Sequence, residues 1–127
     1  MPTIWNITER MEGNATILLA AVRGLSVEQP PEGNRLVASI DGHVRDGYRT
    51  ILINLRDAHY IDSDGLGEIA RGFTLAHAAG GWLAICELVP KVRDLFRVTR
   101  LDEQIPIFLT ELEGLQALRG GTSVPPS

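Results

Sequence analysis

The part of this sequence whose residue types best suit chemistry is a serine between two aspartates, followed by two closely spaced glycines. These residues are Asp62, Ser63, Asp64, Gly65 and Gly67. One structural interpretation is that Ser63 caps a helix while both carboxylates complement the positive end of the helix dipole. It does not explain the two glycines in the first helical turn, where each costs about 1 kcal/mol relative to alanine. Small residues there leave the backbone open to a partner surface or a phosphate, so this segment is the candidate functional site.

Two predicted elements position this segment. Thr50–Leu55 is a run of strand length with β-branched residues, which predicts a buried central strand. The helix that follows is expected to end at Gly80 and Gly81, because glycine commonly stands just past a helix C-terminus. The end of a buried strand and the start of a helix is the usual place for a ligand or regulatory site in an α/β sheet. The stripe expected to pack this helix against the sheet comprises Leu66, Ile69, Ala70, Phe73 and His77.

The start of the chain predicts an antiparallel hairpin. Its strands are Trp5–Met11 and Thr16–Val22, joined by a turn at 12–14, and a loop follows over Leu25–Gly33. Two more short strands are predicted at Trp82–Cys86 and Ile105–Phe108.

Three further helices show apolar residues at helical spacing. The first helix is capped by Asn34 and carries Leu36, Val37, Ile40 and Val44. The second begins at Pro90 and carries Val92, Leu95, Phe96 and Thr99. The third begins with a capping box at Thr110–Glu113 and carries Leu112, Leu115 and Leu118. Strands and helices that alternate with short links imply parallel crossovers. The predicted fold class is therefore α/β, with a mixed sheet. Residues 1–118 are expected to form one domain, followed by a flexible C-terminal tail over residues 119–127.

Composition excludes several classes of protein. With 127 residues, 44% of them hydrophobic, the chain suits one globular domain, and a net charge of −4 argues against direct binding of nucleic acid. Cys86 is the single cysteine, so no intramolecular disulfide can form, and a cytoplasmic location is expected. The start of the sequence does not resemble a signal peptide, and the longest apolar run, Ile17–Val22, is far shorter than the roughly 20 residues of a membrane helix, so membrane insertion is not expected.

The sequence does not predict an enzyme. Ser63 lacks the Gly-x-Ser-x-Gly context of a hydrolase, and the three histidines at 43, 59 and 77 are scattered. The dinucleotide fingerprint fails at Ala70, and a calcium loop begun at Asp62 fails at Leu66 and Phe73, where oxygen ligands belong. We therefore expect no catalytic residue, no metal and no cofactor.

The candidate segment resembles the signature of STAS domains, specifically those of bacterial anti-sigma factor antagonists. The likeness rests on Ile61-Asp62-Ser63-x-Gly65-Leu66-Gly67 after the strand at 50–55, and on three later motifs in the same order and spacing. These motifs are Gly80-Gly81-Trp82-Leu83-Ala84-Ile85-Cys86, Val89-Pro90-Lys91-Val92-Arg93-Asp94-Leu95-Phe96 and Thr99-Arg100-Leu101-Asp102. The resemblance covers about residues 14–118 and implies the STAS fold, a mixed sheet with helices packed mainly on one face.

The resemblance also implies a function. Members of this family bind an anti-sigma factor that is also a serine kinase, and so release a sigma factor. The kinase phosphorylates the serine that follows the motif aspartate, here Ser63, and a serine phosphatase restores the active form. We expect the partner to contact the helix that opens at Ser63 and the loop at 57–60, with Glu68 and Arg71 facing outward. The expected partner-binding residues are Asp62, Asp64, Gly65, Leu66, Gly67 and Arg71.

One position departs from the family pattern. The residue after the acceptor is usually a small hydroxyl residue or alanine, and here it is Asp64. A permanent carboxylate beside Ser63 either hinders recognition by a kinase or partly imitates the phosphorylated state. The alternative function is a STAS scaffold that is not phosphorylated, binding a partner constitutively or serving as a subunit of a larger signalling or lipid-transport assembly.

Overall fold

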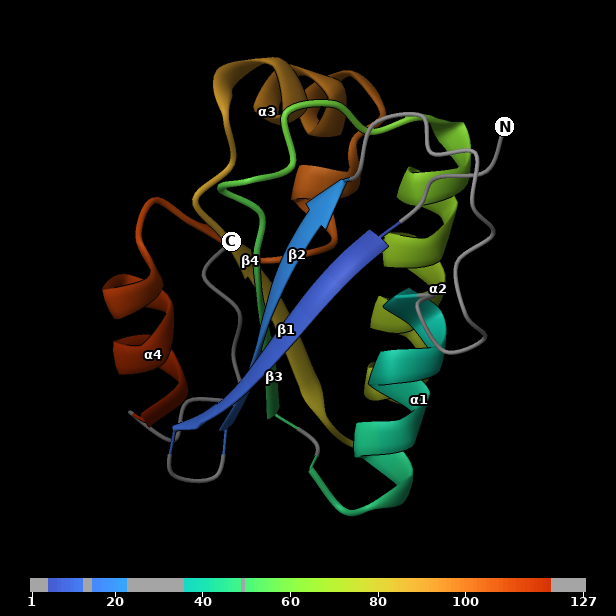
Figure 1. The fold of residues 1–127 in the computed structure, drawn as a ribbon, viewed down its shortest axis with the longest axis vertical. Coiled ribbons are helices and arrows are strands. Elements are labelled where there is room, and N and C mark those ends of the chain that lie inside the picture. The colour runs from blue at the N-terminus through green and yellow to red at the C-terminus, as the bar shows by residue number, and fades with distance from the viewer. Residues whose placement is uncertain (1–4, 13–14, 23–35, 49, 120–127) are drawn as a thin grey trace.

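The computed structural model describes residues 5–12, 15–22, 36–48 and 50–119, and these residues form one five-stranded sheet with helices on both faces (Figure 1). The strands lie in chain order, and β1 is antiparallel to β2 while every later pair is parallel. The predicted hairpin and mixed sheet are therefore confirmed. The strands are β1 (Trp5–Glu12), β2 (Ala15–Val22), β3 (Thr50–Asn54), β4 (Trp82–Cys86) and β5 (Ile107–Phe108).

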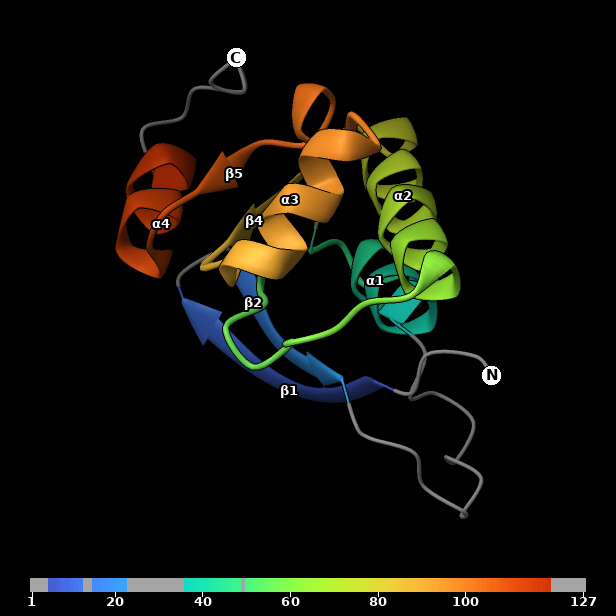
Figure 2. The same cartoon turned by 90° about the horizontal axis from the view of Figure 1, so that it is seen from above.

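The described helices cover the two faces of the sheet unequally. They are α1 (Leu36–Arg45), α2 (Ser63–Ala78), α3 (Pro90–Val98) and α4 (Glu111–Arg119), with a short 3-10 turn at Leu101–Glu103. α1 and α2 lie side by side on one face and α4 lies on the other (Figures 1 and 2). α3 packs into the same apolar cluster as α1 and α2. The prediction of helices mainly on one face is confirmed.

Alternation along the central strands builds the two apolar layers. Ile51 and Ile53 of β3 contribute to the larger cluster, which also holds Phe96 of α3 with no exposed surface. Leu52, between those isoleucines, points the other way and packs with Leu115 of α4. This alternation follows from the two-residue repeat of a strand, which sends neighbouring side chains to opposite faces.

The buried face of α2 differs from the predicted stripe. Ile69 is buried as expected, but Leu66, Ala70 and Phe73 are half-buried, and His77 is exposed with its ring stacked on Phe73. The residues of α2 that are buried are Gly65, Glu68, Ile69, Gly72 and Ala76. The cause is close packing between helices, because a Cβ placed on Gly72 would lie 2.3 Å from Cδ1 of Ile40 in α1.

The last strand is shorter than predicted, and the last helix buries a different set of residues than predicted. β5 comprises only two residues, and Leu112 is 63% exposed while Leu115 is buried. The predicted cap is present, since the backbone N–H of Glu113 donates to the Thr110 hydroxyl at 3.1 Å. α4 continues through Arg119, the first residue of the predicted tail.

Several predictions lie outside the described residues. They concern the turn at 13–14, the loop at 25–33, the cap at Asn34, the side chain of Leu118 and the tail at 120–127. Within the described ranges, no helix has both the length and the apolar character that crossing a bilayer requires.

Candidate functional site

The loop between β3 and α2 is anchored from beneath. Leu55, Ala58 and Ile61 are buried, and the backbone N–H of Leu55 donates to the Cys86 carbonyl of the neighbouring strand at 3.1 Å. Between these anchors the side chains face outward, and Tyr60 is 70% exposed. α2 therefore begins at the same end of the sheet as α3, because both helices follow parallel strands (Figure 2).

Asp62, and not Ser63, caps α2. Its backbone is extended, and its Oδ1 accepts a hydrogen bond from the backbone N–H of Gly65 at 2.8 Å. Ser63 is the first residue of the helix, and its side chain is exposed. Within the described part of the chain, the Ser63 hydroxyl makes no hydrogen bond. Capping by the aspartate leaves this hydroxyl available to solvent and to a partner.

The other predicted site residues fall into two groups. Asp64 and Arg71 are exposed, as a contact surface requires, and Leu66 and Gly67 are half-buried. Gly65 is buried, so the two glycines do not form one exposed pair. Glu68 is also buried, at 9% exposure, and does not face outward as predicted.

A polar network that the sequence did not predict lies at the end of β3, on the face covered by α4. The Asn54 side chain, with no exposed surface, donates to Oε2 of Glu111 at 2.9 Å and accepts from the backbone N–H of Arg56 at 2.9 Å. Glu111 also pairs with Arg10 of β1. Burial opposes the charged form of Glu111, but the hydrogen bonds from Asn54 and Arg10 and the nearby positive charges outweigh it and lower the pKa of this carboxyl.

Three groups beside this network have the types of donor atoms that metals use. The Cys86 thiol and the carboxylates of Glu87 and Glu111 lie within 4.8 Å of one another. Burial, together with the two carboxylates, raises the pKa of the Cys86 thiol to about 12, so the thiol stays protonated at neutral pH. Glu111 already accepts from Asn54, and Glu87 accepts from the Glu111 backbone N–H at 2.9 Å. These hydrogen bonds give the cluster a structural role at the start of α4.

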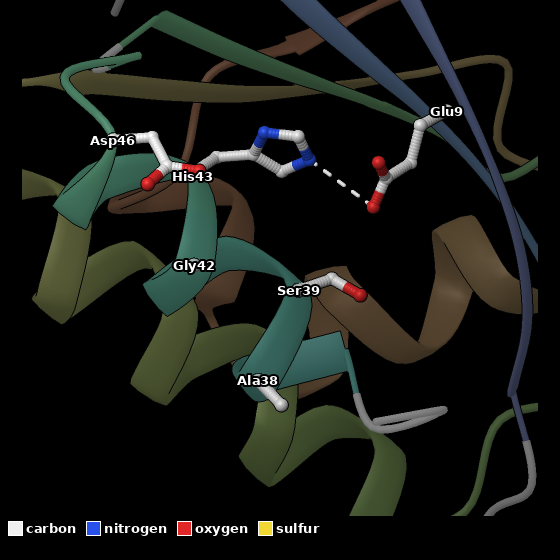
Figure 3. A pocket seen from close by; sticks show the side chains of 6 residues that line it. All are labelled: Glu9, Ala38, Ser39, Gly42, His43 and Asp46. Carbon is white, nitrogen blue, oxygen red and sulfur yellow. Dashed lines mark ion pairs between the residues drawn. The ribbon is translucent and has the colours of Figure 1, made fainter. Parts of the chain in front are cut away.

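A hollow of about 320 Å³ lies between β1 and α1 (Figure 3). His43 Nε2 stands 3.1 Å from a carboxylate oxygen of Glu9 across it. Its lining comprises Glu9, Ala38, Ser39, Gly42, His43 and Asp46. None of these residues comes from the segment around Ser63, so the hollow is separate from the candidate site.

The comparison with known protein families decides which family this arrangement represents. The sequence profile of the STAS domain matches residues 31–114. This chain belongs to the STAS domain family. The predicted resemblance is therefore confirmed, and the matched residues include β3, the loop after it and α2.

Known relatives support the same assignment. The anti-sigma F factor antagonist of Paenibacillus polymyxa is 29% identical to this STAS domain over 97 residues, which are 66% of this chain and 83% of that protein. The crystal structure of TM1081 from Thermotoga maritima covers 89% of this chain and 94% of its own at 24% identity, with a TM-score of 0.76. The structure of the phosphorylated form of SpoIIAA from Bacillus covers 89% of this chain and 99% of its own at 17% identity, with a TM-score of 0.60. The two structures show the shared fold.

Proposed function

We propose that this STAS protein is an anti-sigma factor antagonist, which binds an anti-sigma factor and thereby releases a sigma factor. The observation that carries the proposal is an exposed Ser63 hydroxyl at the start of α2, left free because Asp62 provides the cap. The similarity to an anti-sigma F factor antagonist supports the class of partner. In this proposal the protein acts in the cytoplasm by binding, without catalysis, cofactor or direct contact with nucleic acid.

The proposed contact surface is the exposed part of the loop and of the first turns of α2. Tyr60 offers a large aromatic side chain that is 70% exposed, and such residues are common at the centre of binding interfaces. Asp64 and Arg71, both exposed on α2, add opposite charges to this surface. Gly65 is buried, so a substitution there would disturb the fold as well as the surface, and Tyr60→Ala and Arg71→Glu are the better probes of binding.

The proposed switch is phosphorylation of Ser63 by the anti-sigma factor, acting as a serine kinase with ATP. The serine Oγ forms a bond to the γ-phosphorus, the bond from that phosphorus to the β,γ-bridging oxygen breaks, ADP leaves, and a base of the kinase takes the hydroxyl proton. A phosphate at a helix N-terminus is tolerated by the dipole, so the fold should persist. A serine phosphatase reverses the step by hydrolysis.

Charge supplies the reason why phosphorylation would weaken binding. A phosphate carries about −1.5 to −2 near pH 7 and would stand beside Asp62 and Asp64. The surface would then hold roughly four negative charges, which repel an acidic docking surface. A loss of ~1.4 kcal/mol in binding free energy lowers affinity tenfold.

A second function is favoured by one observation, the exposed Asp64 carboxylate next to the acceptor. In that case the protein is a scaffold that is not phosphorylated, bound constitutively to its partner or serving as a subunit of a signalling or lipid-transport assembly. The two functions predict different behaviour of Ser63 variants.

The test is a pull-down with the purified protein, followed by intact-mass measurement after ATP and the recovered partner are combined. Ser63→Ala should bind the partner and gain no phosphate, whereas Ser63→Glu should bind at least tenfold more weakly. Thr74→Ala, which removes an exposed hydroxyl further along α2, is the matched control and should gain phosphate normally. Asp64→Ser should increase binding or labelling if the carboxylate imitates phosphate.

Two results would contradict the proposal. A Ser63→Ala variant that is phosphorylated like the wild type would move the acceptor to another hydroxyl. A Ser63→Glu variant that binds as tightly as the wild type would favour the constitutive scaffold.

A further inference from the structure

Arg71 of α2 lies folded back along its own helix toward Ser63. Its Nη1 stands 3.4 Å from the position that a Cβ on Gly67 would occupy, and its Cζ and Nη2 stand at 4.0 Å. The side chain is exposed, and among the described residues it has no ion pair or hydrogen bond. A charged guanidinium therefore lies on the surface at Gly67, with no counter-ion among the residues that the structure describes.

Helix geometry places this guanidinium one helical turn from the proposed phosphate acceptor. Ser63, Gly67 and Arg71 are spaced four residues apart, so they form one continuous row along α2. Residues four apart on a helix have Cβ atoms about 5–6 Å from each other, and side chains lean toward the N-terminus. Because Gly67 has no side chain, nothing on this row stands between the Arg71 guanidinium and the Ser63 side chain.

We propose that Arg71 is the intramolecular counter-ion of phosphorylated Ser63, reached across the gap that Gly67 leaves. This inference rests on the proposed phosphorylation of Ser63. A phosphate lengthens the Ser63 side chain, and a guanidinium binds phosphate through two parallel N–H···O hydrogen bonds. Among the described residues, Arg71 makes no ion pair with Asp64 or any other carboxylate in the unmodified protein, so the guanidinium is available for this contact.

The pairing gives the switch a second component. In the unmodified protein, Arg71 presents an exposed positive charge to the partner. After phosphorylation the same charge is held by the phosphate. The partner then loses an attractive contact in addition to meeting a repulsive one. Arg71 acts here as a positioning residue of the switch.

The test uses the full chain with phosphoserine inserted at position 63 during synthesis, which requires no kinase. The second pKa of the phosphate is about 6 when no group perturbs it, and phosphorus NMR follows it directly. A paired guanidinium favours the dianion and lowers this pKa. Arg71→Gln should therefore raise the measured pKa by about 0.5, the size expected for one exposed ion pair, and the difference should shrink in about 1 M salt.

Two further variants isolate the contact. Arg93→Gln removes an exposed charge from α3 and should leave the phosphate pKa unchanged. Gly67→Leu keeps every charge but fills the gap, and should raise the pKa as Arg71→Gln does. Equal pKa values in the wild type and Arg71→Gln, or an equal rise in Arg93→Gln, would overturn the pairing. A rise in Arg71→Gln without one in Gly67→Leu would overturn the route across Gly67.

This measurement separates the inference from the proposed function. Because the phosphoserine is built into the chain, an absent kinase does not affect the titration. A titration without an Arg71 effect would end the inference and leave the partner switch to the Ser63 binding experiment.

Discussion

Replacing Gly72 by alanine tests how closely α1 and α2 pack. In a free helix this change stabilises by about 1 kcal/mol, because glycine has the greater backbone freedom in the unfolded chain. Here the new methyl carbon would stand 2.3 Å from Cδ1 of Ile40, well inside the roughly 3.5–4.0 Å at which carbon atoms attract. Ile40 has no exposed surface, so its side chain has little room to move. Overpacking of this kind costs about 1–3 kcal/mol. We expect Gly72→Ala to lower the free energy of unfolding by up to about 2 kcal/mol overall.

Urea unfolding followed by circular dichroism measures this change. Gly42→Ala in α1 is the matched control, because its added Cβ meets no atom within 4 Å, and we expect it to stabilise by up to about 1 kcal/mol. Ile40→Val removes the Cδ1 methyl and alone should cost about 0.5–1.5 kcal/mol. Combined with Gly72→Ala, it should cost clearly less than the sum of the two single changes. If Gly72→Ala stabilised the protein as Gly42→Ala does, the close approach of α1 and α2 would be refuted.

Three other substitutions probe separate parts of the structure. Phe96→Ala should lower the free energy of unfolding by about 3–5 kcal/mol, because the ring is fully buried, whereas Val98→Ala at a 76% exposed position should change it little in the same urea experiment. Asp62→Ala should lower the free energy of unfolding by about 0.5–2 kcal/mol, because the cap on α2 is lost. Asp62→Asn should retain most of this stability, since asparagine also caps helices. Equal losses in the two variants would show that the cap is not the cause. The lowered pKa of Glu111 means that its stabilising effect is complete above the ordinary value of 4.5 and is lost as pH falls through the folded value. Unfolding curves of wild type and Glu111→Gln should therefore converge on acidification, and a constant difference would contradict the shift.

Strands with a continuous apolar run, and helices with apolar residues at helical spacing, could be predicted from the sequence. Thr50–Leu55 and Trp82–Cys86 were predicted as strands because short β-branched or apolar runs suit buried strands, and the structure has strands at Thr50–Asn54 and Trp82–Cys86. The helix at 90–98 was predicted because proline suits a first turn and the apolar residues behind it follow one face.

The face of α2 could not be predicted because apolar character and burial differ there. Large side chains at helical spacing point to a stripe that includes Phe73 and His77. In the structure, Gly72 and Ala76 are buried on this helix, since only small residues permit α1 and α2 to approach closely.

The capping residue of α2 also differs from the predicted one. Asp62 and Ser63 both suit a cap, and only the backbone geometry distinguishes them.

The polar network on the α4 face had no signal in the sequence. Arg10 and Glu111 are separated by 101 positions, and no local pattern links a residue of the first strand to one at the start of the last helix. Asn54 ends a strand whose other residues are apolar or β-branched, so its burial also depends on the later arrival of α4. Such contacts depend on the tertiary arrangement and are found only after it is known.

The order of the strands in the sheet affects how the protein can form during synthesis. Each described strand pairs with the strand before it, so no strand must be inserted between two already paired neighbours. A chain that leaves the ribosome N-terminus first can therefore extend the sheet from one edge as each segment emerges. Contacts between chain neighbours also have low closure entropy and favour rapid folding. The Arg10–Glu111 pair is then the contact that closes last, when the final helix joins the first strand.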